Sequence, residues 1–168
     1  HLLAEVMRRA YRDRAEYLGD PDYVSIPLST LLSQQHAQEM ARTINLDRAT
    51  RSAAMGRMLS VSAGQHTTHF SIVDSNGNSV AATLSINLPF GSAFTVPGTG
   101  VLLNDEMDDF SAQVGAPNAY GLVGSEANAI APGKRPLSSM TPSFVSFERG
   151  DDHYFAALGT PGGSRIIS

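Results

Sequence analysis

The sequence predicts an α+β fold in which helices come first and β-strands follow. Within residues 1–66, apolar side chains recur at the three- and four-residue spacing of amphipathic helices. From residue 67 onward, short alternating runs rich in β-branched residues are separated by Asn-Gly and Gly-rich turns, the pattern of β-hairpins. The charge balance changes at the same boundary, because residues 1–66 carry a net charge of +1 and residues 67–168 a net charge of −5.

Two helices are expected in the first part. The apolar spacing predicts a helix over residues 2–18, which should end at Gly19 in a left-handed cap before Asp20 and Pro21. A second helix is expected after Ser29, whose hydroxyl can cap its first turn. Residues 47–66 lack sustained periodicity and are expected to form a long exposed connection, of the kind that is often functional.

Two hairpins are expected in the second part. Strands over 67–74 and 79–88 flank the Asn76-Gly77 turn, and strands over 144–148 and 154–158 flank a polar turn. Residues 104–142 are rich in Gly, Pro, Asn and Ser, which indicates ordered loops around a site. The segment 161–164 should lead into the start of a helix.

The composition excludes several classes of function. The 168 residues are 42% hydrophobic and carry a net charge of −4, with no run near the roughly 18 apolar residues of a membrane-spanning helix. Because basic residues are not in excess, nucleic acid is not an expected partner. The absence of cysteine excludes disulfides and thiolate chemistry. No metal is expected either, since His66 and His69 would point to opposite faces of a strand.

Thr67 stands where the exposed connection meets the first strand. Threonine is common in strands, so its position alone says little about function. An N-terminal threonine, however, is a good nucleophile, because its own α-amino group, with a pKa of about 7.7–8.0, serves as general base for the hydroxyl. Cleavage between His66 and Thr67 would create this arrangement.

Four motifs, in the same order and at nearly the same spacing, resemble the γ-glutamyltranspeptidase family. They are Thr67–Ser71, Leu102–Phe110, Lys134–Pro142 and Pro161–Arg165. The segments 10–14 and 17–21 also resemble the last helices of the family's large subunit. We therefore expect an internal part of a longer protein, with residues 1–66 ending the large subunit and residues 67–168 beginning the small subunit.

The resemblance implies an N-terminal-nucleophile hydrolase with an αββα four-layer sandwich, incomplete in this chain. The precursor would cleave itself before Thr67, which would then attack the γ-carbonyl of a γ-glutamyl compound such as glutathione. Water would resolve the resulting ester in hydrolysis, and an amino acid or dipeptide would resolve it in transpeptidation. No cofactor is implied. The implied partners are the remainder of the two subunits, and the implied location is periplasmic or extracellular, as in bacterial members of the family.

The resemblance also assigns roles to individual residues. Catalytic roles fall on the nucleophile Thr67, on Ser85, which stands where the family usually has a second threonine, and on the oxyanion-binding Gly162 and Gly163. Substrate-binding roles fall on Asn87, Glu106 and Asp109 for the α-ammonium, Ser138 and Ser139 for the α-carboxylate, and Tyr120 as a lid. In the family, an arginine from an earlier part of the large subunit completes the carboxylate clamp, and that residue is not in this chain. Asp105 replaces a usual asparagine and adds a negative charge beside the ammonium site.

Two alternatives remain open. A cephalosporin or glutaryl acylase, or a γ-polyglutamate-processing relative, would share the fold. The isolated 168 residues, if they were the whole molecule, could also be a non-catalytic fragment with exposed sheet edges.

Overall fold

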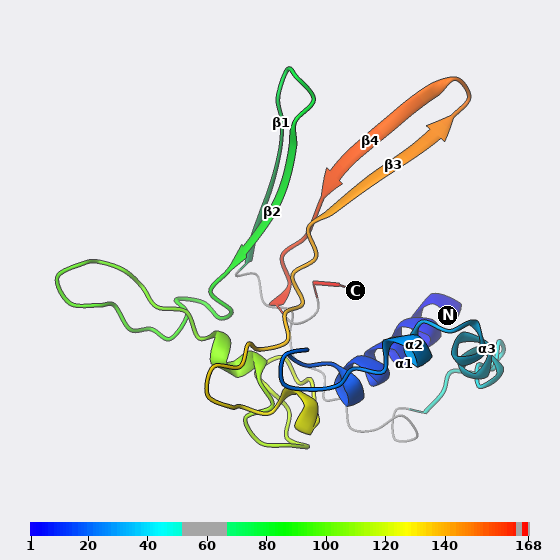
Figure 1. The fold of residues 1–168 in the computed structure, drawn as a ribbon, viewed down its shortest axis with the longest axis horizontal. Coiled ribbons are helices and arrows are strands. Elements are labelled where there is room, and N and C mark those ends of the chain that lie inside the picture. The colour runs from blue at the N-terminus through cyan, green and yellow to red at the C-terminus, as the bar shows by residue number, and fades with distance from the viewer. Residues whose placement is uncertain (52–66, 164–165, 168) are drawn as a thin grey trace. The chain divides into compact units, whose positions relative to one another are not determined.

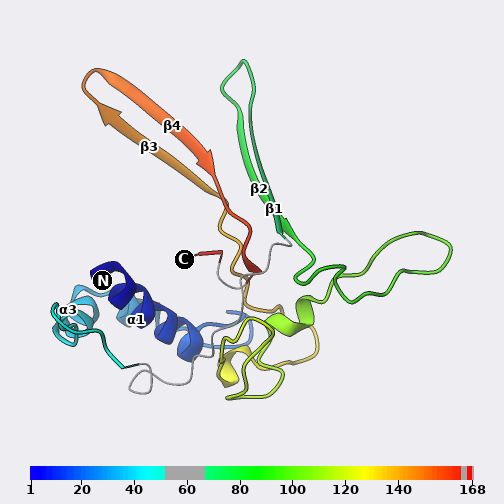
Figure 2. The ribbon, with the colours of Figure 1, turned by 180° about the vertical axis from the view of Figure 1, so that it is seen from behind.

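The computed structural model describes residues 1–51, 67–163 and 166–167. In chain order its elements are α1 (Leu2–Tyr17), α2 (Leu28–Leu31), α3 (Gln34–Arg42), β1 (Thr67–Val73), β2 (Ser79–Ser85), the 3-10 helices η2 (Glu106–Asp109) and η3 (Glu126–Asn128), β3 (Ser143–Arg149) and β4 (Asp152–Leu158) (Figure 1). This mixture confirms the α+β prediction. The named strands form two two-stranded antiparallel sheets, β1 with β2 and β3 with β4 (Figure 2).

The chain divides into two compact units that do not follow the predicted subunit boundary. One unit contains residues 1–61 and 107–137, and the other contains residues 62–106 and 138–168. Most of the loops predicted over 104–142 belong to the first unit, where Phe110 and Tyr120 are buried. The division between residues 66 and 67 concerns a peptide bond to be cleaved, and it stays a prediction.

The end of α1 differs from the expectation. Leu18 ends the helix with φ −91° and ψ 139°, and Gly19 is not left-handed, so the predicted cap was wrong. Gly19 is needed for space instead, because a Cβ atom there would lie 2.0 Å from the carbonyl oxygen of Ala127. A contact more than 100 residues away in the sequence therefore selects glycine at this position.

Replacing Gly19 with alanine should destabilise the protein by about 1–3 kcal/mol, the usual cost of overpacking a close contact. The measurement is the free energy of unfolding in urea of the full-length protein. Gly98→Ala is the control, because no atom lies within 4 Å of a Cβ at Gly98 and only the cost of its positive φ remains. A smaller loss for Gly19→Ala than for Gly98→Ala would contradict the steric explanation.

The second predicted helix is two helices. Ser29 lies inside α2 and does not cap it, so that prediction was wrong. The capping residue is Ser33, whose hydroxyl oxygen accepts a hydrogen bond from the backbone N–H of His36 at 3.1 Å, at the start of α3. The helical conformation is interrupted between α2 and α3. A serine at this interruption satisfies one of the free N–H groups in the first turn of α3.

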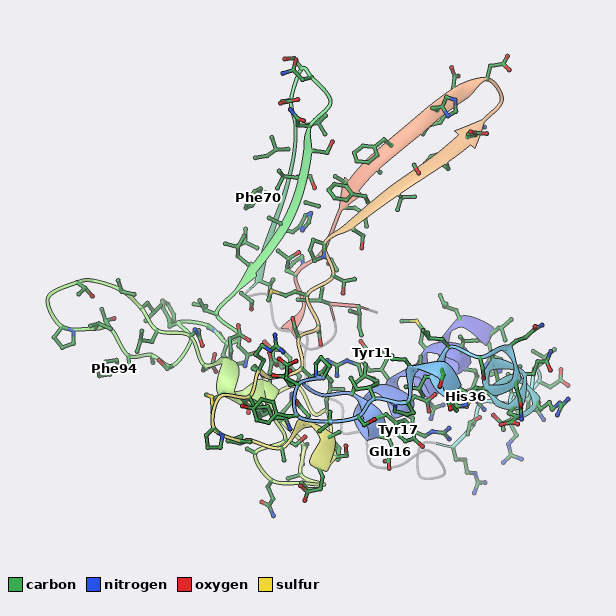
Figure 3. The ribbon with its side chains drawn as sticks, viewed as in Figure 1. Tyr11, Glu16, Tyr17, His36, Phe70 and Phe94 are labelled. Carbon is green, nitrogen blue, oxygen red and sulfur yellow. The ribbon has the colours of Figure 1, made fainter. Side chains whose placement is uncertain are left out.

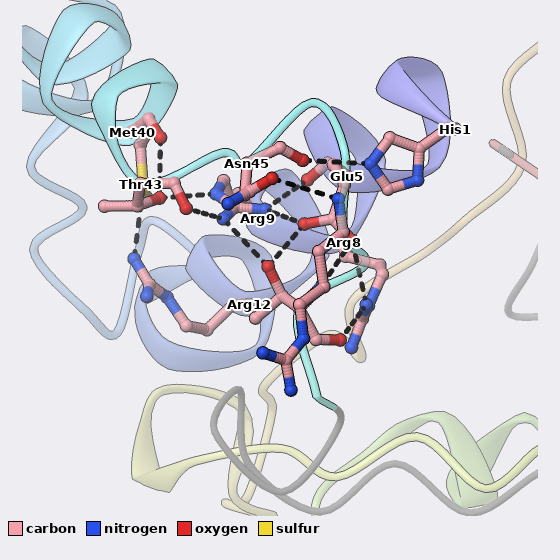
Figure 4. A network of polar contacts seen from close by, with 10 residues as sticks. His1, Glu5, Arg8, Arg9, Arg12, Met40, Thr43 and Asn45 are labelled. Atoms are coloured by element: carbon pink, nitrogen blue, oxygen red, sulfur yellow. Dashed lines mark hydrogen bonds and ion pairs between the residues drawn. The ribbon is translucent and has the colours of Figure 1, made fainter.

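A buried ion pair within α1, between Glu5 and Arg9, is hydrogen-bonded to the chain that follows α3 (Figure 4). The Glu5 carboxylate accepts hydrogen bonds from Arg9 Nη1 at 2.7 Å and from the Thr50 hydroxyl at 2.6 Å. Arg9 Nε donates to the Thr43 hydroxyl at 2.6 Å. The hydrogen bonds from Thr50 and Arg9 lower the pKa of Glu5 to about 2. These contacts fix the chain up to residue 50.

Both hairpins form as predicted. Gly77 has the positive φ, +83°, that the Asn76-Gly77 turn requires. β2 ends at Ser85, earlier than the predicted residue 88, because Asn87 has a φ of +68° and leaves the extended conformation. In the β3–β4 hairpin, Phe144 stacks on Phe155 with ring centroids 5.5 Å apart.

Large apolar side chains remain exposed along the hairpins and the loop after β2. Phe70 of β1 is 43% exposed, and Phe94 in the loop is 54% exposed (Figure 3). None of the helices in the described ranges combines the length and the apolar character that crossing a bilayer requires. The expected connection over 52–66 and most of the expected helix after Gly163 fall outside the described residues.

Candidate active site

Thr67 is the first residue of β1, and its side chain is buried with 7% exposure. It is the register partner of Ser85, the last residue of β2. Cross-strand partners bring their side chains to the same face of a sheet, and the Thr67 Oγ1 and Ser85 Oγ atoms lie 3.2 Å apart. The hairpin register therefore holds the candidate nucleophile against a second hydroxyl. His66, the other side of the predicted cleavage site, lies outside the described residues.

The Ser85 hydroxyl connects Thr67 to Asn87. Ser85 Oγ accepts a hydrogen bond from the backbone N–H of Asn87 at 3.0 Å. Asn87 is 2% exposed, and its Nδ2 donates to the Asp105 carbonyl oxygen at 3.3 Å. Asp105 Oδ1 in turn accepts from the backbone N–H of Leu88 at 3.0 Å. One continuous set of polar contacts thus links the candidate nucleophile to a candidate α-ammonium ligand and to Asp105.

The two candidate oxyanion donors lie in the segment after β4. Gly162 has a φ of +151° and Gly163 a φ of +58°, and both values lie in the range that favours glycine. The Gly163 carbonyl oxygen accepts a hydrogen bond from the backbone N–H of Ile166 at 3.0 Å. In the turn after β4, residues 161–163, the role of the Gly162 and Gly163 N–H groups toward an oxyanion stays a prediction.

His69 is a site neighbour that the sequence interpretation treated only as a strand residue. It lies two residues after Thr67, on the same face of β1. Its ring contacts the Thr83 hydroxyl at 2.8 Å and the Ser71 hydroxyl at 3.0 Å. A Cβ atom at Gly159 would lie 2.2 Å from His69 Nδ1, so the ring packs directly against the backbone that leads to Gly162. The two-residue spacing from Thr67 was the available signal in the sequence.

The two serines predicted to bind the donor α-carboxylate, Ser138 and Ser139, lie in a turn before β3. Ser139 is buried, whereas Ser138 is exposed. Ser138 Oγ accepts a hydrogen bond from the backbone N–H of Met140 at 3.1 Å, and the Ser139 carbonyl accepts one from the Thr141 hydroxyl at 3.0 Å. The turn is therefore locally ordered.

The remaining candidates lie in or beside η2 and in the loop after it. The backbone N–H of Glu106 donates to Asn104 Oδ1 at 3.0 Å, and the Asp109 carbonyl accepts from Asn128 Nδ2 at 2.7 Å. Tyr120 is buried, with 3% exposure. Asp109 and Tyr120 belong to the unit with residues 107–137, and their roles toward a substrate stay predictions. Within the described ranges, no group of three or more His, Asp or Glu side chains is arranged to hold a metal ion.

Comparisons with known proteins agree with the motifs. The chain is 50% identical over 168 residues to the glutathione hydrolase proenzyme of Pseudomonas sp. strain A14 and 46% identical over 169 residues to that of Escherichia coli K12. It covers 29% and 28% of the lengths of these two relatives, so it spans less than a third of either.

Solved structures show the same likeness. The γ-glutamyltranspeptidase from Pseudomonas nitroreducens complexed with L-DON matches with 60% sequence identity and a TM-score of 0.53, over 60% of this chain and 50% of that chain. A mutant of the Helicobacter pylori γ-glutamyltranspeptidase matches with 53% identity and the same TM-score, over 60% of this chain and 52% of that one. The sequence model of the gamma-glutamyltranspeptidase family matches residues 1–168, and the chain therefore belongs to that family.

Proposed function

We propose that the protein containing this chain cleaves itself between His66 and Thr67 and then hydrolyses and transfers γ-glutamyl groups. The observation that carries the proposal is the position of Thr67, buried at the first residue of β1 with Ser85 Oγ 3.2 Å from its hydroxyl. The names of the relatives support it, since they are called glutathione hydrolase proenzymes, and one matched structure is described by roles of its C-terminus in autoprocessing and catalysis.

In the proposed reaction, the Thr67 hydroxyl oxygen attacks the γ-carbonyl carbon of the donor, and the hydroxyl proton passes to the free α-amino group of Thr67. Backbone N–H groups of Gly162 and Gly163 donate to the oxyanion that forms. The protonated α-amine then gives its proton to the leaving amine, and a γ-glutamyl ester of Thr67 remains. Water or the amine of an amino acid or dipeptide then attacks the ester carbonyl carbon, and the α-amino group of Thr67 takes a proton from it. The ester C–O bond breaks, this proton returns to the Thr67 oxygen, and glutamate or a γ-glutamyl amide is released. The scheme includes no cofactor.

Donor recognition is proposed to use both charged groups of the γ-glutamyl head. Asn87, Glu106 and Asp109 would take the α-ammonium, and Ser138 and Ser139 would take the α-carboxylate. Tyr120 would cover the bound donor. The proposal includes the αββα sandwich, completed by the rest of both subunits, and a periplasmic or extracellular location. Support for these points comes from the family resemblance.

A pair of chromogenic donors tests this function against the acylase alternative. The full-length protein is assayed with γ-glutamyl p-nitroanilide and with glutaryl p-nitroanilide, which lacks the α-ammonium. We expect kcat/KM to be at least about 100-fold higher for the γ-glutamyl donor. The glutaryl donor has no ammonium group and therefore loses the charged hydrogen bonds that this group makes. Equal rates, or faster glutaryl hydrolysis, would favour the acylase. A protein inactive on both donors would overturn the proposal.

Ser85→Ala should slow both self-cleavage and turnover about 10- to 100-fold, because the Asn87 N–H loses its acceptor and Thr67 loses its neighbouring hydroxyl. Ser85→Thr is the matched variant that keeps the hydroxyl and adds a methyl group that restricts its rotamers. We expect Ser85→Thr to cleave at least as fast as the wild type. Intact mass over time measures the uncut fraction, and normal cleavage in Ser85→Ala would contradict this role.

A further inference from the structure

Asp20 makes an unusually complete set of contacts with one arginine. Its side chain is 1% exposed. Asp20 Oδ2 accepts hydrogen bonds from the backbone N–H and from Nε of Arg135, both at 2.9 Å, and Oδ1 accepts from Nη2 at 2.6 Å. Arg135 Nη2 also contacts the Asp22 carboxylate. One carboxylate therefore holds both the side chain and the backbone of Arg135, which fixes the position of the chain as well as neutralising a charge.

Further hydrogen bonds join the same two stretches of chain. Tyr23 Oη donates to the Pro132 carbonyl at 2.7 Å, and Ser125 Oγ donates to the Glu16 carbonyl at 2.8 Å. The backbone N–H of Leu137 donates to Asn128 Oδ1 at 3.1 Å. The end of α1 and the segment after it are thus joined to the segment 125–137 by several contacts, and the bond to Asn128 within that second segment also holds Leu137.

A buried carboxylate is a costly way to join two segments. The Asp20 side chain is 1% exposed whereas that of Arg135 is 65% exposed, so the desolvation cost falls on the carboxylate, and such an ion pair is weak evidence for stability alone. Such a pair does specify one geometry, because the planar guanidinium donates its hydrogen bonds to the carboxylate in a fixed orientation. Its hydrogen bonds lower the pKa of Asp20 below its ordinary range, so the pair stays ionised at neutral pH. The contacts of Asp20 are therefore better suited to fixing the position of the Arg135 segment than to adding stability.

The order of the residues along the chain indicates which part of the site Asp20 holds in position. Arg135 lies three residues before Ser138, and Leu137 lies directly before Ser138. Ser138 and Ser139 are the residues proposed to bind the donor α-carboxylate. Asp20 lies in the part predicted to be the large subunit, and Arg135 lies in the part predicted to be the small subunit.

We propose that Asp20 is a positioning residue for donor binding, which acts through Arg135 to hold the Ser138–Ser139 turn where it receives the α-carboxylate. This inference rests on the proposed function. After cleavage, a residue of one subunit would set the donor affinity of a site on the other. The effect should concern donors that carry an α-carboxylate and should appear in KM.

The test compares Asp20→Asn with wild type in the full-length protein on two donors. γ-Glutamyl p-nitroanilide carries the α-carboxylate, and 4-aminobutanoyl p-nitroanilide keeps the amine and lacks the carboxylate. We expect Asp20→Asn to raise KM for the first donor about 10-fold or more with kcat nearly unchanged, and to change kcat/KM for the second by less than about 3-fold. Asp22→Asn is the matched control, because Asp22 contacts the same arginine and its side chain is 73% exposed; it should leave both donors unaffected.

Two further variants keep the test decisive. If Asp20→Asn does not accumulate as a folded, cleaved protein, Arg135→Lys keeps the charge and the backbone N–H but loses the two-pronged contact, and it should raise KM for the carboxylate donor alone. In a Ser139→Ala background, Asp20→Asn should add less than about 2-fold to KM. Equal losses on both donors, or a loss of kcat alone, would overturn the inference. A wild-type protein inactive on both donors would instead overturn the proposed function.

Discussion

Replacing Thr67 with alanine should leave the precursor as a single uncut chain and lower γ-glutamyl transfer by roughly 10³-fold or more, as loss of a nucleophile does in other enzymes. The hydroxyl oxygen of Thr67 is the atom that attacks in both proposed reactions, first the peptide bond before it and then the donor. Alanine removes this atom and keeps the strand, because the β1–β2 register does not depend on the Oγ1 atom. Intact mass measures the cleavage, and anilide release measures the turnover.

Thr68→Ala is the matched control for this prediction. Thr68 is the next residue of β1, pairs with Leu84 and has an exposed side chain on the other face of the strand. It removes the same hydroxyl and methyl groups at a place where no contact with Ser85 exists. Cleavage and turnover by Thr68→Ala should match the wild type. An active, cleaved Thr67→Ala protein would show that another group is the nucleophile.

Gly162→Ala should lower kcat by roughly 10²- to 10³-fold with little change in KM, the effect of displacing one oxyanion donor. Space is not the reason, since the nearest atom to a Cβ at Gly162 is the Ile166 backbone nitrogen at 3.7 Å. The φ of +151° is the reason, because a residue with a Cβ atom rarely adopts this value and would rotate the N–H groups of the turn. Steady-state kinetics with γ-glutamyl p-nitroanilide measure the effect.

The control is Gly98→Ala, which also places a Cβ on a glycine of positive φ, +78°, with no atom within 4 Å. It imposes backbone strain in the same unit but away from the turn after β4. Its kcat should remain near the wild-type value. If Gly162→Ala raises KM and leaves kcat unchanged, the turn acts in ground-state binding, and the oxyanion role would be wrong.

The local parts of the fold could be predicted from the sequence because local patterns determine them. The apolar spacing of residues 2–18 and the Asn76-Gly77 turn each specify an element within a few residues, and both elements form. The hydrophobic pattern did not reveal where α2 ends and α3 begins, because both Ser29 and Ser33 are chemically suitable caps. Ser33 is the cap because the helix is interrupted immediately before it.

Features that depend on distant residues could not be predicted in the same way. Gly19 fits a left-handed cap by local rules, yet the Ala127 carbonyl is what excludes a side chain there. Asp20 and Arg135 are 115 residues apart, and nothing in either local sequence indicates that they pair. Asn87 has a φ of +68°, which ends β2 early. This conformation accompanies contacts with Ser85 and Asp105, which the alternation of apolar and polar residues does not reveal.

The candidate site was predictable to a similar extent. The family resemblance named Thr67 and Ser85, and the hairpin register explains physically why they meet, since the two are direct partners at one end of the hairpin. The packing of His69 against Gly159 was not predicted. It joins β1 to the segment after β4, and these two segments are far apart in the sequence, so no local pattern indicates the contact.

The intact mass of the purified full-length protein tests the central claim most directly. We predict two polypeptides, the smaller of which begins at Thr67, because cleavage between His66 and Thr67 frees the α-amino group that the reaction uses as its base. A single chain that stays uncut after long incubation would contradict the account, since Thr67 would then have no free amine.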